Sequence, residues 1–203
     1  MDKTMLFFCI GRLCAGCAPR GRKTVLLFQK GCLKMKRSQL QTLSRAAIIA
    51  ALYAALTMIL HPISYGPVQF RAAEALTLLP VICAEAVPGL FIGCLLANLL
   101  GGAVWYDVVF GSIATLLAAF AARRLRKIPA LAAAMPVLSN GLIVGAVVYL
   151  AYIHLPGSAI EPVALLGAMG SVALGELVIC YALGLPLLSV LRRMPKLFPD
   201  AGK

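Results

Sequence analysis

Apolar segments long enough to cross a membrane fill most of this chain, and they constrain its fold more than any other feature. Ala46–Leu60 consists mainly of alanine, leucine and isoleucine, and apolar sequence resumes over Ala72–Gly101. Only 13% of the residues are charged, whereas about 25% are charged in a typical soluble domain. We therefore expect an all-α integral membrane protein that crosses the cell membrane several times.

The lysines and arginines are distributed as topology signals rather than as a nucleic-acid surface. The formal net charge is +12, which by itself could indicate a nucleic-acid partner. The basic residues instead cluster between apolar segments, as in Arg123–Lys127, and cytoplasmic loops of membrane proteins carry such an excess. Of the nineteen lysines and arginines, only Arg71 falls outside in the topology that this rule favours. We expect no nucleic-acid partner, a lipid bilayer around the bundle, and both termini in the cytoplasm.

Six transmembrane helices are expected in one membrane domain, residues 35–203. Pro80, Glu85 and Pro88 interrupt Ala72–Gly101, which is too long for one ordinary span. Dividing this region into two short helices also places Arg123–Lys127 on the same side as the basic N-terminus. The predicted bundle has helices at about 42–61, 73–86, 88–102, 106–122, 131–153 and 163–191.

Residues 1–34 are basic and lack an apolar run long enough to span a membrane. Four cysteines in this segment have a spacing that resembles a plant-type iron–sulfur pattern. They are Cys9, Cys14, Cys17 and Cys32. Short patterns of this kind often match by chance, and we expect no cofactor. Translation that starts at Met35 would give a basic patch followed by a helix, so we treat residues 1–34 as an N-terminal extension that is either untranslated or disordered.

Polar side chains in and beside the apolar segments are the candidates for a binding site. A carboxylate in the middle of a membrane span costs about 2.5–3.5 kcal/mol on insertion scales, so ionisable residues there usually have a function. The stretch Ile63–Pro80 places several polar residues between two apolar segments, after a turn at Tyr65-Gly66-Pro67. The candidate binding residues are Tyr65, Gln69, Arg71, Glu74, Asn98, Trp105, Asp107, Asn140, Tyr149 and Glu176.

Several candidates also have an interpretation that requires no ligand. Arg71 and Glu74 could pair locally in a solvated loop. Glu176 could be a protonated side chain hydrogen-bonded to Asn140. Trp105 and the neighbouring tyrosines could form the aromatic belt at the membrane interface. The burial of each side chain and its hydrogen-bond partners distinguish these interpretations from a role in ligand binding.

The sequence lacks the motifs of common nucleotide-binding and hydrolytic sites. It contains no G-x-x-x-x-G-K-[ST] loop for ATP, no G-x-S-x-G elbow and no H-E-x-x-H helix. We therefore expect no enzyme activity, no catalytic residue and no bound metal. A pocket lined by aromatic rings and carboxylates suits a small cationic or nucleobase-like solute, because rings stack on flat bases and carboxylates accept hydrogen bonds from N–H groups.

Small residues recur at intervals of about four on two of the predicted helices, a spacing that lets helix backbones approach closely. The rows are Ala47, Ala51 and Ala55; Ala46, Ala50 and Ala54; and Gly89, Gly93, Ala97 and Gly101. The same spacing occurs in ordinary packing within a bundle, so the rows by themselves do not identify a partner.

Five segments within Ser44–Arg193 occur in the same order as the segments of a known family. They are ISYGPVQFRAAEALTLLP, PGLFIGCLLANLLGG, DVVFGSIATLLAAFAARRLR, PVLSNGLIVGAVVY and VALGELVICYALGLPLL. Taken together they resemble the QueT family, whose members are S components, the substrate-binding membrane subunits of energy-coupling factor (ECF) transporters. The resemblance implies six helices and uptake of a queuosine precursor, an aminomethyl-deazaguanine base.

The resemblance also implies protein partners, namely a transmembrane coupling subunit and two cytoplasmic ATPases. S components are similar to one another in docking through a small-residue row on the first helix, which here matches Ala47, Ala51 and Ala55. Residues 1–34 lie outside the resemblance.

Other functions stay open at this point. The chain could be an S component for another vitamin or nucleobase-like solute. Two alternatives from other classes are a small membrane channel and an intramembrane enzyme. A channel should show a polar stripe along the whole bundle, whereas the inner halves of the predicted helices are almost entirely apolar. An enzyme needs a nucleophile–base pair or a metal set, and the sequence shows neither.

Overall fold

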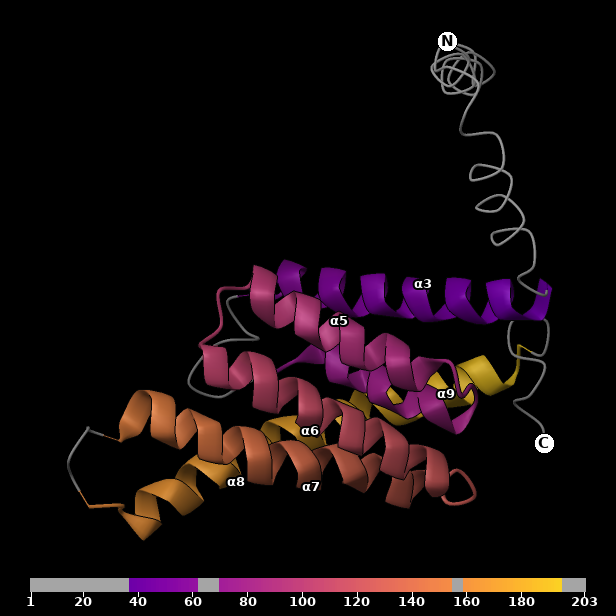
Figure 1. Ribbon diagram of the computed structural model, residues 1–203. Coiled ribbons are helices and arrows are strands. Elements are labelled where there is room, and N and C mark those ends of the chain that lie inside the picture. Colours follow the sequence, from indigo (N-terminus) through magenta and orange to yellow (C-terminus); the bar gives the residue numbers. More distant parts are fainter. Residues whose placement is uncertain (1–36, 62–69, 155–158, 195–203) are drawn as a thin grey trace, which may run out of the picture. The chain divides into compact units, whose positions relative to one another are not determined.

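The structure is a computed structural model that describes residues 37–61, 70–154 and 159–194 (Figure 1). The described residues are helical or lie in short connections between helices, and they contain no β-strand. The chain divides into two compact units, Met1–Leu40 and Gln41–Lys203. All contacts given below lie within Gln41–Lys203.

The described helices follow one another along the chain with short connections. They are α3 (Arg37–Ile59), η1 (Ala72–Val81), α5 (Ala86–Leu100), α6 (Trp105–Arg124), α7 (Pro129–Val148), η2 (Tyr149–Ile153), α8 (Pro162–Val178), η3 (Ile179–Gly184) and α9 (Leu185–Arg192). The elements η2 and η3 are π-helical turns that continue the preceding α-helix. Helices α7 and η2 therefore form one rod, and α8, η3 and α9 form another.

Within the described residues, four helical segments are long and apolar enough to cross a membrane. They are Gln39–Ile59, Trp105–Arg124, Pro129–Ile153 and Pro162–Arg192. The remaining two apolar helices, η1 and α5, are shorter. The prediction of an all-α, multi-pass membrane protein is thus confirmed, while six complete crossings and cytoplasmic termini stay predictions.

The largest difference from the predicted ranges concerns the second helix, which was expected over 73–86. The structure has a 3-10 helix, η1, that ends at Val81, and α5 begins at Ala86. Pro80 explains the difference, because proline lacks an N–H donor and its ring clashes with the carbonyl four residues earlier in an α-helix. Helix α3 also begins earlier than expected, at Arg37 rather than near residue 42.

Helix η1 lies at the centre of the bundle. Every residue from Ala73 to Val81 is buried, and η1 contacts α5, α6, α7, η3 and α9. A run of ten residues is unusual for a 3-10 helix, which rarely exceeds three or four residues. Because this helix rises about 2.0 Å per residue, ten residues span roughly 20 Å, compared with about 15 Å in an α-helix. The 3-10 conformation lets a short segment extend deep into the bundle.

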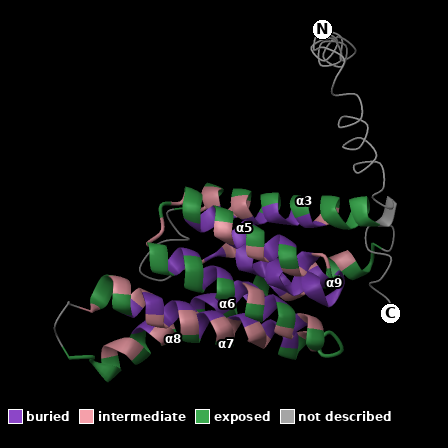
Figure 2. Cartoon of the chain, in the orientation of Figure 1, coloured by how far each residue is buried: buried purple, intermediate pink, exposed green. Residues whose placement is uncertain are grey.

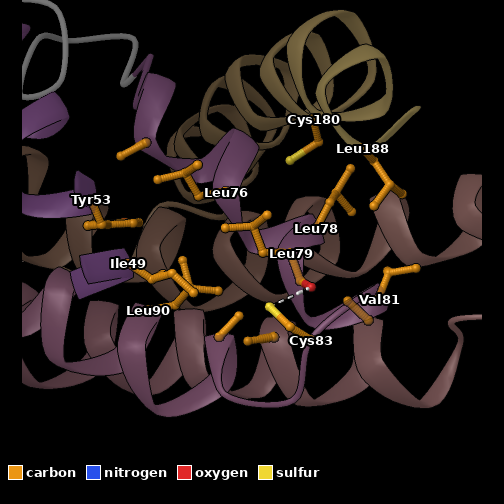
Figure 3. Close-up of a cluster of buried hydrophobic side chains, with 14 of the residues drawn as sticks. Ile49, Tyr53, Leu76, Leu78, Leu79, Val81, Cys83, Leu90, Cys180 and Leu188 are labelled. Atoms are coloured by element: carbon orange, nitrogen blue, oxygen red, sulfur yellow. Dashed lines mark hydrogen bonds between the residues drawn. The ribbon is translucent and has the colours of Figure 1, made fainter. Parts of the chain in front are cut away.

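The apolar side chains of η1 form the main hydrophobic core (Figure 3). Figure 3 shows Leu76, Leu78 and Leu79 among side chains from α3, α5, η3 and α9. On the η3 side the approach is close, since a Cβ added at Gly184 would lie 2.8 Å from Leu78 Cδ1. The wide turn at η3 and the absence of a side chain at Gly184 therefore make room for η1.

The outward faces of the helices are exposed (Figure 2), and many of the side chains on them are large and apolar. Leu52, Phe110, Leu142 and Leu174 are 46–65% exposed, and many other large apolar residues are similarly exposed. Exposed apolar areas of this size are rare on monomeric soluble proteins. These faces are suited to contact with lipid, as expected for a multi-pass membrane protein.

Helices α3 and α5 pack together through two of the small-residue rows. Ala46 and Ala50 are 9% and 5% exposed, and the backbone of α5 approaches them at Gly89 and Gly93. A Cβ added at Gly89 would lie 2.7 Å from the Ala46 carbonyl oxygen. A Cβ added at Gly93 would lie 2.9 Å from both the Ala50 carbonyl oxygen and Tyr53 Cβ. The close contact therefore depends on glycine at both positions.

Replacing Gly93 by alanine should destabilise the bundle, because the new methyl group meets backbone that must move. We expect the free energy of unfolding to fall by about 1–3 kcal/mol, the usual cost of overpacking a core. Thermal unfolding of the purified protein in detergent measures this loss. Gly167→Ala is the matched control, because no atom lies within 4 Å of its added Cβ, and it should be neutral or stabilise by up to about 1 kcal/mol. Equal stability of the two variants would contradict the α3–α5 contact described here.

Candidate ligand-binding site

Buried polar side chains are concentrated in the core of the bundle. The buried polar residues are Thr57, Arg71, Glu74, Thr77, Asn98, Asp107, Ser112, Thr115, Asn140 and Glu176. Burial of such groups away from water is costly unless they are hydrogen-bonded or bind a ligand. We use the name polar cluster for Tyr53, Arg71, Glu74, Asn98, Asp107, Thr115, Asn140 and Glu176.

Glu74 is the residue on which the polar cluster converges. The Tyr53 hydroxyl, from α3, donates to Glu74 Oε1 at 2.5 Å. The Thr115 hydroxyl, from α6, lies 3.4 Å from the same oxygen. Because η1 carries Glu74 into the centre, side chains from two other helices, α3 and α6, reach one carboxyl group.

Asn140 holds the second deep carboxyl group, Glu176 on α8. The Asn140 amide Nδ2 donates to Glu176 Oε1 at 2.9 Å. Cys180, one turn further along the helix, lies 3.8 Å from Glu176 Oε2 and 3.9 Å from the Glu74 carbonyl oxygen. The hydrogen bond between Asn140 and Glu176 that the sequence suggested is therefore present, and it belongs to a larger network rather than to an isolated pair.

Arg71 and Asp107 form a buried ion pair beside Glu74. Arg71 Nη2 lies 2.6 Å from Asp107 Oδ2, and the two side chains are only 4% and 5% exposed. Asn98 Nδ2 donates to the Asp107 backbone carbonyl at 3.2 Å and so holds the start of α6 against α5. The alternative in which Arg71 pairs with Glu74 in a solvated loop is wrong, because both side chains are buried and the ion pair is with Asp107 on α6.

Gly111 makes room for this ion pair. A Cβ at Gly111 would lie 2.9 Å from Asp107 Oδ1 and 3.3 Å from Asn98 Nδ2. Thr115, one turn further along α6, bonds back to the Gly111 carbonyl at 3.1 Å while it faces Glu74. One face of α6 thus carries Asp107, Gly111 and Thr115 at successive turns, and this face lines the polar cluster.

Three buried acceptor oxygens in the cluster have no hydrogen-bond donor among the described residues. They are Glu74 Oε2, Asp107 Oδ1 and Asn140 Oδ1. The orientation of Asn140 is fixed because its Nδ2 must face the Glu176 carboxyl oxygen. A buried acceptor without a donor costs roughly 1–3 kcal/mol, more when it is charged. Three such oxygens in one cluster are able to accept hydrogen bonds from a ligand.

The charges in the described core are also unbalanced. Three carboxyl groups are buried, on Glu74, Asp107 and Glu176, and Arg71 is the one buried basic side chain among the described residues. Buried charges of one sign need a partner of the other sign or must be neutralised. No group of three metal-ligating side chains occurs in the described ranges. The site is suited to a ligand that carries several N–H donors and a positive charge.

The structure brings six of the ten predicted site residues into the polar cluster. They are Arg71, Glu74, Asn98, Asp107, Asn140 and Glu176. Trp105 lies on the surface at the first turn of α6 and is 69% exposed. Tyr149 is buried, but its hydroxyl accepts a hydrogen bond from the Glu161 N–H and its ring lies 5.6 Å from that of His154. Tyr65 and Gln69 lie outside the described residues.

Sequence reasoning missed Tyr53 and Thr115. Tyr53 follows Ala46 by seven residues and Ala50 by three, so it continues the buried face of α3. A hydroxyl-bearing side chain on the buried face of an apolar helix needs a partner, and this spacing was a signal that could have found it. Thr115 gave no comparable signal, because threonine in a membrane helix often bonds to its own backbone.

The two alanine rows on α3 differ in burial. Ala46 and Ala50 are buried against α5, whereas Ala47, Ala51 and Ala55 are exposed. The three exposed alanines therefore form a row of small side chains that is accessible on the described structure. A stripe of this kind permits close approach by another helix.

Comparisons with known proteins give one family and one relative. The sequence profile described as QueT transporter matches residues 43–193. A curated protein from Lactococcus lactis subsp. cremoris (strain MG1363), named "Queuosine precursor transporter QueT", is 40% identical over 85 residues. That match covers 41% of this chain and 50% of the relative, so the chain matches about half the length of that protein. No solved structure matches the chain significantly.

Breaking the buried ion pair should cost much more stability than replacing both of its members. We expect Arg71→Met or Asp107→Leu alone to lower the free energy of unfolding by about 3–5 kcal/mol, because each leaves a buried charge without its partner. The double variant should lose far less than the sum of the two. Chemical unfolding in detergent, without ligand, measures the free energy of unfolding of the wild type, the two single variants and the double variant. Glu85→Gln is the control, because its pair with Arg45 at 3.7 Å is partly exposed and should contribute at most about 1 kcal/mol. Additive losses in the Arg71 and Asp107 cycle would rule out a coupled pair.

Proposed function

The chain belongs to the QueT transporter family, and we propose that it is the substrate-binding S component of an energy-coupling factor transporter that imports a queuosine precursor. The observation that carries this proposal is the set of three buried acceptor oxygens without donors in the described core, on Glu74, Asp107 and Asn140. The name of the Lactococcus lactis relative supports the same substrate class.

The chemistry of the proposed substrate complements the polar cluster. An aminomethyl-deazaguanine carries a ring N–H and an exocyclic amine on one edge, a pyrrole N–H on another, and an aminomethyl group that is protonated at neutral pH. Every one of these groups is a hydrogen-bond donor, and one is a cation. Charge-assisted hydrogen bonds to carboxylates are roughly twice as strong as neutral ones. The ligand would thus supply the donors and the positive charge that the cluster lacks.

We assign the ring edge of the substrate to Glu176. A carboxylate can accept from the ring N–H and the exocyclic amine together, in a paired geometry. Asn140 holds Glu176 through Oε1 at 2.9 Å, and its own Oδ1 is available for a further donor from the ligand. Glu74 Oε2 and Asp107 Oδ1 would then receive the remaining N–H groups. This division leaves Arg71 in its ion pair with Asp107.

Energy for transport would come from partner proteins. The sequence contains no loop that could hold ATP, so we propose that two cytoplasmic ATPases act through a transmembrane coupling subunit. The exposed row Ala47, Ala51 and Ala55 on α3 is the proposed docking surface for that subunit. Its opposite face is already occupied by α5, so the partner would pack on the free side of the same helix.

A channel is disfavoured by the distribution of polar groups along η1. Glu74 and Thr77 are the polar residues of this helix, and the buried side chains that follow them, from Leu78 to Val81, are all apolar. The polar cluster is therefore closed by apolar side chains toward one end, and it does not continue as a stripe through the bundle. An S component for another nucleobase-like solute would share this geometry, and ligand screening separates the two cases.

Purified protein should bind aminomethyl-deazaguanine without ATP, and Glu176→Gln should weaken this binding by about 2–4 kcal/mol, the range for truncating one member of a buried charged pair. The amide places an N–H donor where the ligand also presents N–H groups. Isothermal titration calorimetry in detergent measures both affinities. Glu161→Gln is the control, because Glu161 is exposed at the start of α8, and it should bind as wild type does.

The same titration discriminates between the alternatives. Binding of a vitamin such as riboflavin, with no binding of any deazaguanine, would reject the substrate assignment. If Glu176→Gln binds with wild-type affinity while Glu74→Gln and Asp107→Asn bind more weakly, Glu176 has a structural role. The binding site would then lie nearer to η1 and α6.

Replacing Ala51 by leucine should spare substrate binding and weaken assembly with the coupling subunit. The larger side chain would hold two helix backbones apart where small residues let them touch. Co-purification of the tagged chain with the coupling subunit and ATPases measures the amount of complex. Ala182→Leu is the matched control, because Ala182 is also exposed but lies in η3. An undiminished complex with Ala51→Leu would show that this face does not dock the partner.

A further inference from the structure

Helix α3 reaches the polar cluster through Tyr53. This side chain is 1% exposed, and its hydroxyl donates to Glu74 Oε1 at 2.5 Å. The other buried hydroxyl of α3, on Thr57, bonds back to the Tyr53 carbonyl of its own helix at 2.9 Å. The two hydroxyl groups therefore have different roles, since that of Tyr53 crosses to another element and that of Thr57 does not.

The donors to Glu74 act on one of its two oxygens. The hydroxyl groups of Tyr53 and Thr115 both face Oε1, at 2.5 and 3.4 Å. Oε2 is buried and has no donor among the described residues. A carboxyl group held in this way cannot rotate without losing the Tyr53 hydrogen bond. The arrangement leaves Oε2 as the acceptor that a ligand can use.

The position of Tyr53 is itself fixed by the close contact between α3 and α5. Gly93 lies so near that a Cβ there would be 2.9 Å from Tyr53 Cβ. The ring is enclosed in the apolar core with Ile49 and Leu90 (Figure 3). Tyrosine has few rotatable bonds, so a packed ring places its hydroxyl with little freedom. The backbone contact between α3 and α5 therefore fixes the position of the Tyr53 hydroxyl relative to Glu74.

We propose that Tyr53 is a positioning residue of the ligand site, whose hydroxyl orients the Glu74 carboxyl group so that Oε2 accepts an N–H of the substrate. This inference rests on the proposed function. It adds a residue from the helix that also carries the proposed docking row, since Ala51 and Ala55 each lie two residues from Tyr53. Tyr53 acts through Glu74 and makes no direct contact with the substrate in this account.

The test is a double-mutant cycle with Tyr53→Phe, Glu74→Gln and the double variant, titrated calorimetrically with aminomethyl-deazaguanine. Tyr53→Phe keeps the packed ring and removes the hydroxyl, and we expect the Kd to rise by at least about tenfold, as for loss of a hydrogen bond to a charged group. The double variant should bind no more weakly than Glu74→Gln, because the amide already places an N–H donor where the ligand needs the Oε2 acceptor. Thr57→Val is the matched control, because it removes a buried hydroxyl from the same helix, and it should leave the Kd unchanged.

The outcomes separate this inference from the proposed function. An unchanged Kd in Tyr53→Phe, or losses that add in the double variant, would overturn the positioning role while wild-type binding upholds the substrate assignment. Failure of the wild type to bind any deazaguanine would reject the proposed function, and the inference with it. If Tyr53→Phe does not fold, Thr115→Val removes the second donor to the same oxygen. It should weaken binding by a smaller factor, again without adding to Glu74→Gln, and an unchanged Kd would count against the inference.

Discussion

A carboxyl group inside a lipid bilayer needs hydrogen-bond donors from the protein or from a ligand. Glu74 places such a group in the middle of the bundle. The hydroxyl groups of Tyr53 and Thr115 meet this requirement from two different helices. The elements that carry these side chains could not separate without leaving a buried acceptor unpaired, at a cost of several kcal/mol in hydrocarbon. One hydrogen-bonding requirement therefore holds the site together and leaves specific oxygens for a ligand.

The 3-10 helix η1 is what makes this arrangement possible. It contacts α5, α6, α7, η3 and α9, and its greater rise per residue carries Glu74 and the apolar residues after it through the core with few residues. Long 3-10 segments and π-helical turns are both uncommon, and both often mark functional sites. Here η1 packs against the π-helical turn η3, where Gly184 admits Leu78. Two irregular helices thus fit one another beside the polar cluster.

Much of this account follows from the sequence, and the remainder depends on tertiary packing. Hydropathy and proline positions located all six apolar segments, and the cost of buried charge correctly marked Arg71, Glu74, Asp107 and Glu176 as exceptional. The partner of Arg71 could not be predicted, because Asp107 lies 36 residues away on α6. The sequence does place Tyr53 on the buried face of α3, but its partner Glu74 lies 21 residues away on η1 and could not be predicted. The 3-10 conformation of η1 also differs from the prediction, because an α-helix was expected over 73–86 although Pro80 lies within that range.

The central claim is that the three acceptor oxygens of the described core that lack donors contact the substrate, together with Glu176. A structure of the protein bound to aminomethyl-deazaguanine tests it most directly. The account predicts ligand N–H donors within about 2.7–3.2 Å, the normal hydrogen-bond range, of Glu74 Oε2, Asp107 Oδ1 and Asn140 Oδ1. A ligand bound instead beside Trp105 and Tyr149, with those three oxygens paired to water or to protein donors, would contradict it.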